Sequence, residues 1–141
     1  MKHAAILLGL IAVLGFDGAA CARIAYAEAK ELCGSLGVMN TTSLPEGVDP
    51  DKVRVCAEHP LSSAVKESVH DEHKRWCWEG RPVGCSGGYC FKSCAQPGSG
   101  EWCWTAKEQG FGDWATCGED EHCSVGFACG AGGCASCGCS C

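Results

Sequence analysis

The sequence predicts a small disulfide-rich protein, in which a short α-helical N-terminal segment is followed by a β-rich module held together by cystines. Three observations predict this fold class. Fifteen of the 141 residues are cysteine, a fraction typical of disulfide scaffolds in short secreted chains. The N-terminus has the layout of a signal peptide, which indicates an oxidising destination. Beyond residue 75, cysteine, tryptophan and glycine become concentrated, and alternation replaces helical spacing.

Residues 1–22 are the expected signal peptide. Lys2 precedes an apolar run over residues 4–16, and small residues follow it. This three-part order is that of a secretory leader. The run is too short to cross a bilayer, which needs about twenty apolar residues. We therefore expect a secreted, extracellular protein without a membrane span.

The position of the signal cleavage site decides the cysteine count. Cutting after Ala22 removes Cys21 and leaves fourteen cysteines. Cutting after Ala27 leaves the same number, whereas cutting after Ala20 retains Cys21 and one unpaired thiol. Because a secreted framework is expected to pair all its cysteines, we favour the cut after Ala22.

Residues 23–75 should form short helices. The apolar spacing predicts a helix within residues 24–36, and Asp49 with Pro50 looks like an N-cap and first turn of a second helix that ends before Pro60. A third helix is expected over residues 62–75. The segment holds two cysteines, which can pair with each other.

Lys74 and Arg75 form a dibasic pair at the end of this segment. Proteases of the kexin type cut on the C-terminal side of such pairs, so residues 23–75 could be a pro-segment removed from residues 76–141. The cysteines divide evenly between the two pieces, which would let each close its own disulfides. The alternative is a basic pair at a solvated helix end, where positive charge is favoured.

Residues 76–141 should form the β-rich module. Period-two alternation predicts strands at Tyr89–Lys92 and at Trp102–Thr105, and the turn-rich residues 96–100 between them predict a hairpin. Residues 75–78 and 114–117 are further strand candidates. Residues 127–141 look like a second hairpin.

Disulfides are expected to replace the core that so short a chain cannot build. The order of the cysteines does not determine which of them pair. The final Cys134, Cys137, Cys139 and Cys141 could also hold a soft metal, but disulfides are favoured in an oxidising compartment, so no metal and no cofactor are expected. The disulfide candidates are Cys33, Cys56, Cys77, Cys85, Cys90, Cys94, Cys103, Cys117, Cys123, Cys129, Cys134, Cys137, Cys139 and Cys141.

The triplet Trp-Cys-Trp occurs twice. On a strand, period two places both tryptophans on one face and the cysteine on the other. The rings could pack across strands as core, or remain exposed as a platform for a protein or glycan partner. We expect Trp114, beside Asp113, to be the most exposed. The candidate binding residues are Trp76, Trp78, Trp102, Trp104 and Trp114.

The charge balance excludes some classes of partner. With eleven Lys and Arg against seventeen Asp and Glu, the chain lacks the basic footprint of nucleic-acid binding. Asn40 begins an Asn-Thr-Thr sequon in an expected loop, so glycosylation there is predicted. No local motif marks a catalytic residue, and we expect a non-enzymatic monomer.

The layout resembles the small secreted cysteine-rich proteins of filamentous fungi, many of which are effector-like. The residues that carry the resemblance are the leader, the stretches 44–49 and 56–61, and the segments GGYCFKSC, EWCWTA and CGCSC. The resemblance implies an effector or interaction protein acting outside the cell on a host or competitor. The alternative is an antimicrobial or killer-type toxin matured after Arg75. Cys90-x3-Cys94 and Cys137-x-Cys139 are similar to the spacings of cystine-stabilised toxins and defensins, although this module is acidic.

Overall fold

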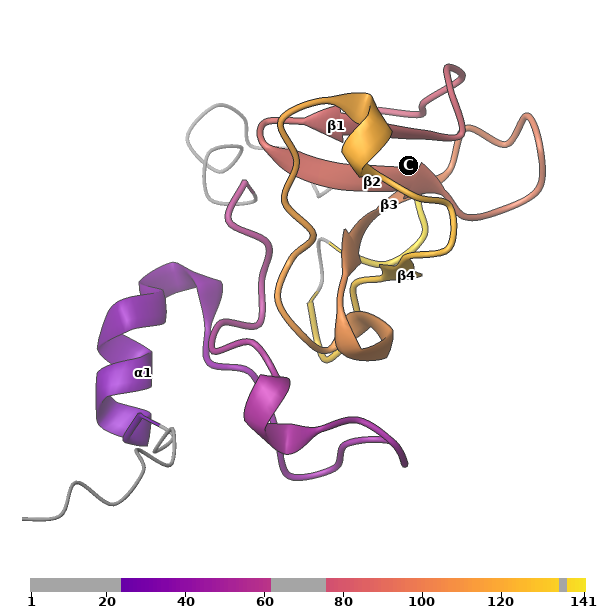
Figure 1. Ribbon diagram of the computed structural model, residues 1–141. Coiled ribbons are helices and arrows are strands. Elements are labelled where there is room, and N and C mark those ends of the chain that lie inside the picture. The colour runs from indigo at the N-terminus through magenta and orange to yellow at the C-terminus, as the bar shows by residue number, and fades with distance from the viewer. Residues whose placement is uncertain (1–23, 62–75, 135–136) are drawn as a thin grey trace, which may run out of the picture.

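The computed structural model describes residues 24–61, 76–134 and 137–141. The expected signal peptide, the expected third helix and the dibasic pair Lys74-Arg75 lie outside the described residues. One four-stranded antiparallel sheet, in the order β1-β2-β3-β4, dominates the described part of the module. Figure 1 shows helix α1 standing away from this sheet, while the end of the same N-terminal segment reaches it. The strands are β1 Val83–Ser86, β2 Tyr89–Ser93, β3 Trp102–Ala106 and β4 Ala128–Cys129.

The first hairpin joins β1 to β2 through Gly87 and Gly88. Both glycines have positive φ, 57° and 85°, as a two-residue hairpin turn of the primed type requires. Cys85 lies opposite Cys90 in this pair. The Gly-Gly dipeptide is a turn signal in the sequence, so β1, which we did not predict, could have been found from it.

The predicted hairpin between Tyr89 and Thr105 is confirmed. β2 and β3 are antiparallel neighbours, with Phe91 opposite Trp104. The expected separation of side chains is also confirmed for the second Trp-Cys-Trp triplet. Cys103 is fully buried and bonded to Cys129, while the rings of Trp102 and Trp104 lie 5.0 Å apart, edge to face.

Three other strand predictions are wrong. Residues 76–78 lie in no strand, and residues 114–117 form only isolated bridges, Ala106 with Trp114 and Tyr89 with Thr116. Residues 127–141 do not form a hairpin with themselves. Instead β4 and Ser140 both pair with β3, at its C-terminal and N-terminal ends.

The N-terminal segment contains one short helix, α1, over Tyr26–Cys33, which ends at Gly34 with a positive φ of 50°. The second predicted helix is wrong. Only a 3₁₀ turn forms at Pro50–Lys52, although the predicted cap is present, since the Asp49 carboxylate accepts a hydrogen bond from the Asp51 amide. After this turn the chain is extended. Its β-branched Val53 forms a bridge with Gly112.

Seven disulfides join all fourteen cysteines of the described residues. Cys33 pairs with Cys56 inside the N-terminal segment, and the other six disulfides lie within residues 77–141. No disulfide of the described residues joins the segment to the module, so their association is non-covalent apart from the chain itself. The six are Cys77–Cys141, Cys85–Cys117, Cys90–Cys123, Cys94–Cys139, Cys103–Cys129 and Cys134–Cys137.

Candidate functional site

A row of aromatic side chains runs along one face of the sheet. Trp78 meets the ring of Phe91 at 5.4 Å between centroids, and Phe91 meets Trp102 at 5.9 Å, both edge to face. Trp104 continues the row next to Trp102. Space for Phe91 exists because its neighbour on β1 is Gly84, where a Cβ atom would come within 2.8 Å of the Phe91 ring.

One end of this row is open to solvent. Trp76 is 93% exposed and Trp78 is 41% exposed, and Trp102 is partly exposed. We call Trp76, Trp78 and Trp102 the tryptophan surface. The three are held together by the backbone, since the Trp102 indole N–H donates to the Trp76 carbonyl at 2.8 Å and the Trp78 amide donates to Gly100 at 2.7 Å.

The other two candidate tryptophans are buried. Trp104 and Trp114 are each only 9% exposed and belong to the core cluster. The expectation that Trp114 is the most exposed tryptophan is therefore wrong. Its ring is covered by the guanidinium of Arg54, whose central carbon lies 4.2 Å from the ring centroid. A charged residue that is distant in the sequence thus covers a tryptophan ring that the sequence alone predicts to be exposed.

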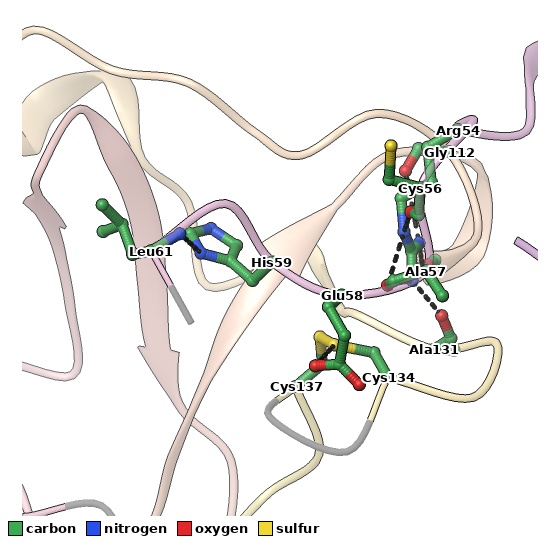
Figure 2. Close-up of a disulfide and its surroundings, with 11 residues drawn as sticks. Arg54, Cys56, Ala57, Glu58, His59, Leu61, Gly112, Ala131, Cys134 and Cys137 are labelled. Atoms are coloured by element: carbon green, nitrogen blue, oxygen red, sulfur yellow. Dashed lines mark hydrogen bonds between the residues drawn. A yellow bond between two sulfur atoms is a disulfide. The ribbon is translucent and has the colours of Figure 1, made fainter. Parts of the chain in front are cut away.

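His59 from the N-terminal segment enters the aromatic core. Its imidazole is fully buried and stacks on Trp104 with centroids 4.4 Å apart and planes 7° apart. Tyr89 and Trp114 meet it edge to face, at 4.5 and 4.7 Å. The imidazole Nδ1 accepts a hydrogen bond from the Leu61 amide at 3.2 Å (Figure 2). That bond places the proton of the neutral ring on Nε2.

Arg54 is the second side chain that joins the segment to the module. It is 5% exposed and donates only to backbone carbonyls. Two of these, Ala57 and Cys56, lie in its own segment, at 3.1 Å each. Gly110, at 2.7 Å, and Ala131 lie in the module. Figure 2 shows the bond to Ala131. The planar guanidinium can satisfy carbonyls in several directions at once, which a lysine could not do.

Burial sets the electrostatics of this junction. Desolvation lowers the pKa of Arg54 to about 10, opposed by the charges of Glu58 and Asp113, so the arginine stays charged. Desolvation, followed by the nearby charge of Arg54, lowers the pKa of His59 to about 3. The histidine is therefore neutral at physiological pH and serves as an aromatic core residue. The sequence reasoning missed both residues, because polar side chains in a short expected helix carry no burial signal.

A carboxylate contacts the Cys134–Cys137 disulfide. Glu58 lies between Arg54 and His59 in the sequence, and its Oε2 is 3.3 Å from the Cys134 sulfur (Figure 2). In the disulfide this sulfur carries no hydrogen, so the contact is not a hydrogen bond in the oxidised state. The Cys137 sulfur belongs to the same cluster, in which all three ligand-type atoms lie within 4.8 Å of one another.

This disulfide differs from the other six in loop size. Its cysteines are three residues apart, whereas the others are separated by 23 to 64 residues. The stabilisation expected from restricting the unfolded chain grows with the logarithm of loop length. It comes to roughly 2 kcal/mol for the shortest loop and roughly 4 kcal/mol for the longest. Cys134–Cys137 is thus the disulfide that the fold needs least.

The sequon asparagine lies on the surface. Asn40 is exposed, and its Oδ1 accepts hydrogen bonds from the amide and the hydroxyl of Thr42, at 2.9 and 2.7 Å. The predicted acceptor position is therefore accessible. Two further cysteine groups in the described residues bring three sulfurs together, but each of those sulfurs is already in a disulfide.

No protein-family model, curated protein or solved structure matches this chain. Among the described residues, none of the helices has both the length and the apolar character needed to cross a membrane. The many disulfides are consistent with an extracellular protein. Any functional assignment therefore has to come from the geometry of the tryptophan surface, the Arg54–His59 junction and the Cys134–Cys137 disulfide.

Proposed function

We propose that this protein acts outside the cell as a non-enzymatic, effector-like interaction protein that binds an extracellular protein of a host or competitor. The observation that carries the proposal is the tryptophan surface. Tryptophan is enriched among residues that dominate binding energy at protein interfaces. The Trp76 side chain is 93% exposed, so this large ring does not stabilise the fold by burial.

The Trp78 ring and the backbone of the tryptophan surface are held in place before any partner binds. The Trp78 indole N–H donates to the Arg81 carbonyl at 2.7 Å, and the ring packs against Gly80, where a Cβ would come within 2.3 Å of it. The Cys77–Cys141 disulfide fixes the residue between Trp76 and Trp78. Pre-organised aromatic anchors lose little conformational entropy on binding, which raises affinity.

The polar atoms of Trp78 and Trp102 favour a protein over a glycan. The indole N–H groups of Trp78 and Trp102 already donate to backbone carbonyls. The rings therefore offer apolar faces, as the centre of a protein interface does. Small polar ligands need convergent hydrogen-bonding groups that fix their orientation, and these two indoles have no donor left to offer.

The test uses the fluorescently labelled, secreted full chain on plant tissue and on microbial cells. We expect saturable surface binding that protease treatment of the cells abolishes and that the double variant Trp76→Ala/Trp78→Ala weakens at least about tenfold. The matched control is Tyr26→Ala/Leu32→Ala, which removes two exposed apolar side chains from α1 and should leave binding unchanged. Protease-resistant binding together with glycan-array signal would replace the protein partner by a sugar. Equal binding by both double variants would remove the tryptophan surface from the proposal.

A toxin matured after Arg75 is the second candidate, and the disulfide pattern supports it. Cys33–Cys56 closes on its own side of the dibasic pair, and the six other disulfides close on the other side. Intact mass of the secreted protein and a growth-inhibition assay distinguish the candidates. Cleaved material that inhibits microbial growth favours the toxin, and uncleaved material that binds without inhibiting growth favours the interaction protein.

A further inference from the structure

The Cys134–Cys137 disulfide combines three features that occur together in none of the other six disulfides. Its two cysteines differ in exposure, since Cys134 is partly exposed and Cys137 is fully buried. It closes the shortest loop. A carboxylate oxygen, that of Glu58, lies 3.3 Å from the accessible sulfur. We propose that this disulfide is a thiol–disulfide exchange site that oxidises a dithiol of an extracellular or secretory-pathway protein.

The difference in access fixes the direction of attack. A thiolate of the partner can reach Cys134 but not the buried Cys137. The sulfur of the partner bonds to the Cys134 sulfur, and the Cys134–Cys137 bond breaks. The electron pair of the broken bond goes to the Cys137 sulfur, which takes up a proton. The second thiolate of the partner then attacks the partner's own sulfur in this mixed disulfide.

That second attack releases Cys134, which also takes up a proton. The partner dithiol has then become a disulfide and has lost two electrons. The Cys134–Cys137 pair has become a dithiol and has gained them. The two protons lost by the partner thiols equal the two gained by the cysteines, so no other co-reactant is needed.

Glu58 favours the reduced product. In the disulfide its carboxylate faces a sulfur that has no hydrogen, and it gains no hydrogen bond from that contact. After reduction the Cys134 thiol can donate to the same oxygen, and hydrogen bonds to ionised acceptors are the stronger kind. The carboxylate therefore makes this disulfide easier to reduce than an isolated one.

Neighbouring residues keep the carboxylate at the sulfur. Glu58 lies four residues after Arg54 and one before His59, and both of those side chains are buried in the module. The Glu58 amide also donates to the Leu36 carbonyl at 3.0 Å. Figure 2 shows Glu58 pointing at the Cys134–Cys137 sulfurs from this stretch. The site depends neither on the tryptophan surface nor on the proposed binding function.

The first test is graded reduction of the full-length oxidised protein in dithiothreitol redox buffers, with thiol trapping and mass mapping. We expect Cys134 and Cys137 to be the first pair labelled, with the near-UV circular dichroism of the folded protein retained. The Glu58→Gln variant should lower the equilibrium constant for reduction about tenfold, a shift of about 30 mV for two electrons. The matched control, Glu101→Gln, should not change it. Opening of any other disulfide first, or an unchanged constant in Glu58→Gln, would overturn the proposal.

The second test uses oxidised glutathione as the probe with single-cysteine variants. The Cys137→Ser variant leaves the accessible thiol and should form the mixed disulfide at least about tenfold faster than Cys134→Ser, whose thiol is buried. Equal rates in the two variants would contradict the assigned roles. If either variant fails to fold, the graded reduction of the unmodified protein still decides the question.

Discussion

The imidazole of His59 lies parallel to the indole of Trp104, 4.4 Å away. The two residues come from opposite sides of the dibasic pair, so this stack is a direct contact between the N-terminal segment and the module. Arg54 makes the second such contact, over Trp114. Several expected outcomes depend on these two side chains.

Stability should fall in mild acid because of His59. The pKa of His59 in the folded protein is about 3, below the value of about 6.5 expected when it is unfolded. Between these values the unfolded chain binds the extra proton. Stability is therefore fully present above about pH 6.5 and is lost at about 1.4 kcal/mol per pH unit as the pH falls toward 3.

Urea unfolding at a series of pH values measures this slope. The His59→Phe variant keeps an aromatic ring at the site and should show a flatter profile, although the Leu61 amide loses its acceptor. The control His122→Asn removes an exposed histidine and should retain the full slope. A His59→Phe profile as steep as that of the unmodified protein would assign the acid sensitivity to other groups, such as the carboxylates.

Replacing Arg54 should destabilise the fold strongly. The Arg54→Leu variant leaves several buried carbonyls without their donor, and we expect a loss of about 3 kcal/mol. Arg54→Lys should recover only part of it, because an ammonium cannot bridge the same set of carbonyls. Denaturant midpoints at neutral pH measure both changes.

Lys52→Met is the matched control for Arg54. Lys52 is two residues away and its side chain is 65% exposed. The loss of stability in Lys52→Met should therefore stay within about 0.5 kcal/mol. A similar small effect for Arg54→Leu would show that water satisfies the carbonyls of Gly110 and Ala131 equally well.

Cutting the chain after Arg75 should not separate the two pieces. The segment and the module share no disulfide among the described residues, but Arg54 and His59 are buried across their junction. We expect kexin-treated protein to elute as one species on native gel filtration and to give two bands on a denaturing, non-reducing gel. The Arg54→Leu variant should dissociate after the same treatment. Release of the module from the unmodified, cleaved protein would show that the junction is too weak to hold.

Gly110 and Gly133 allow a matched test of close packing. Both have positive φ, 96° and 81°, so alanine should cost about 1 kcal/mol at either position through backbone strain. At Gly110 a Cβ would also come within 2.2 Å of the Cys129 carbonyl, whereas at Gly133 nothing lies within 4 Å. We expect Gly110→Ala to lose at least about 2 kcal/mol more than Gly133→Ala. Equal urea midpoints for the two variants would mean that the loop at Gly110 accommodates the added methyl group without further loss of stability.

The sequence predicted the parts of the fold that depend on local pattern. Alternation located β2 and β3, and the Trp-Cys-Trp spacing predicted that Trp102 and Trp104 share a face opposite Cys103. The Asp49 cap was also recognised. The second helix was wrong because Val53 and Cys56 form bridges with distant residues, Gly112 and Val38, and tertiary pairing overrides a weak local preference.

The candidate site was less accessible to sequence reasoning. Trp114 is buried because Arg54 and His59, both far before it in the sequence, pack against its ring. Nothing among the described residues covers Trp76, which is 93% exposed. The contact of Glu58 with the Cys134–Cys137 disulfide likewise joins residues that are far apart in the sequence. Long-range contacts of this kind have no local signature.

Strand β3 pairs with one element that is synthesised before it and with two that are synthesised after it. It can pair with β2 as soon as it emerges, but β4 and Ser140, its other partners, are synthesised only afterwards. The disulfides that reach Cys129, Cys139 and Cys141 must wait for the same residues. The oxidative folding of this module therefore cannot finish before residue 141 has been synthesised, and its rate should depend on disulfide isomerases.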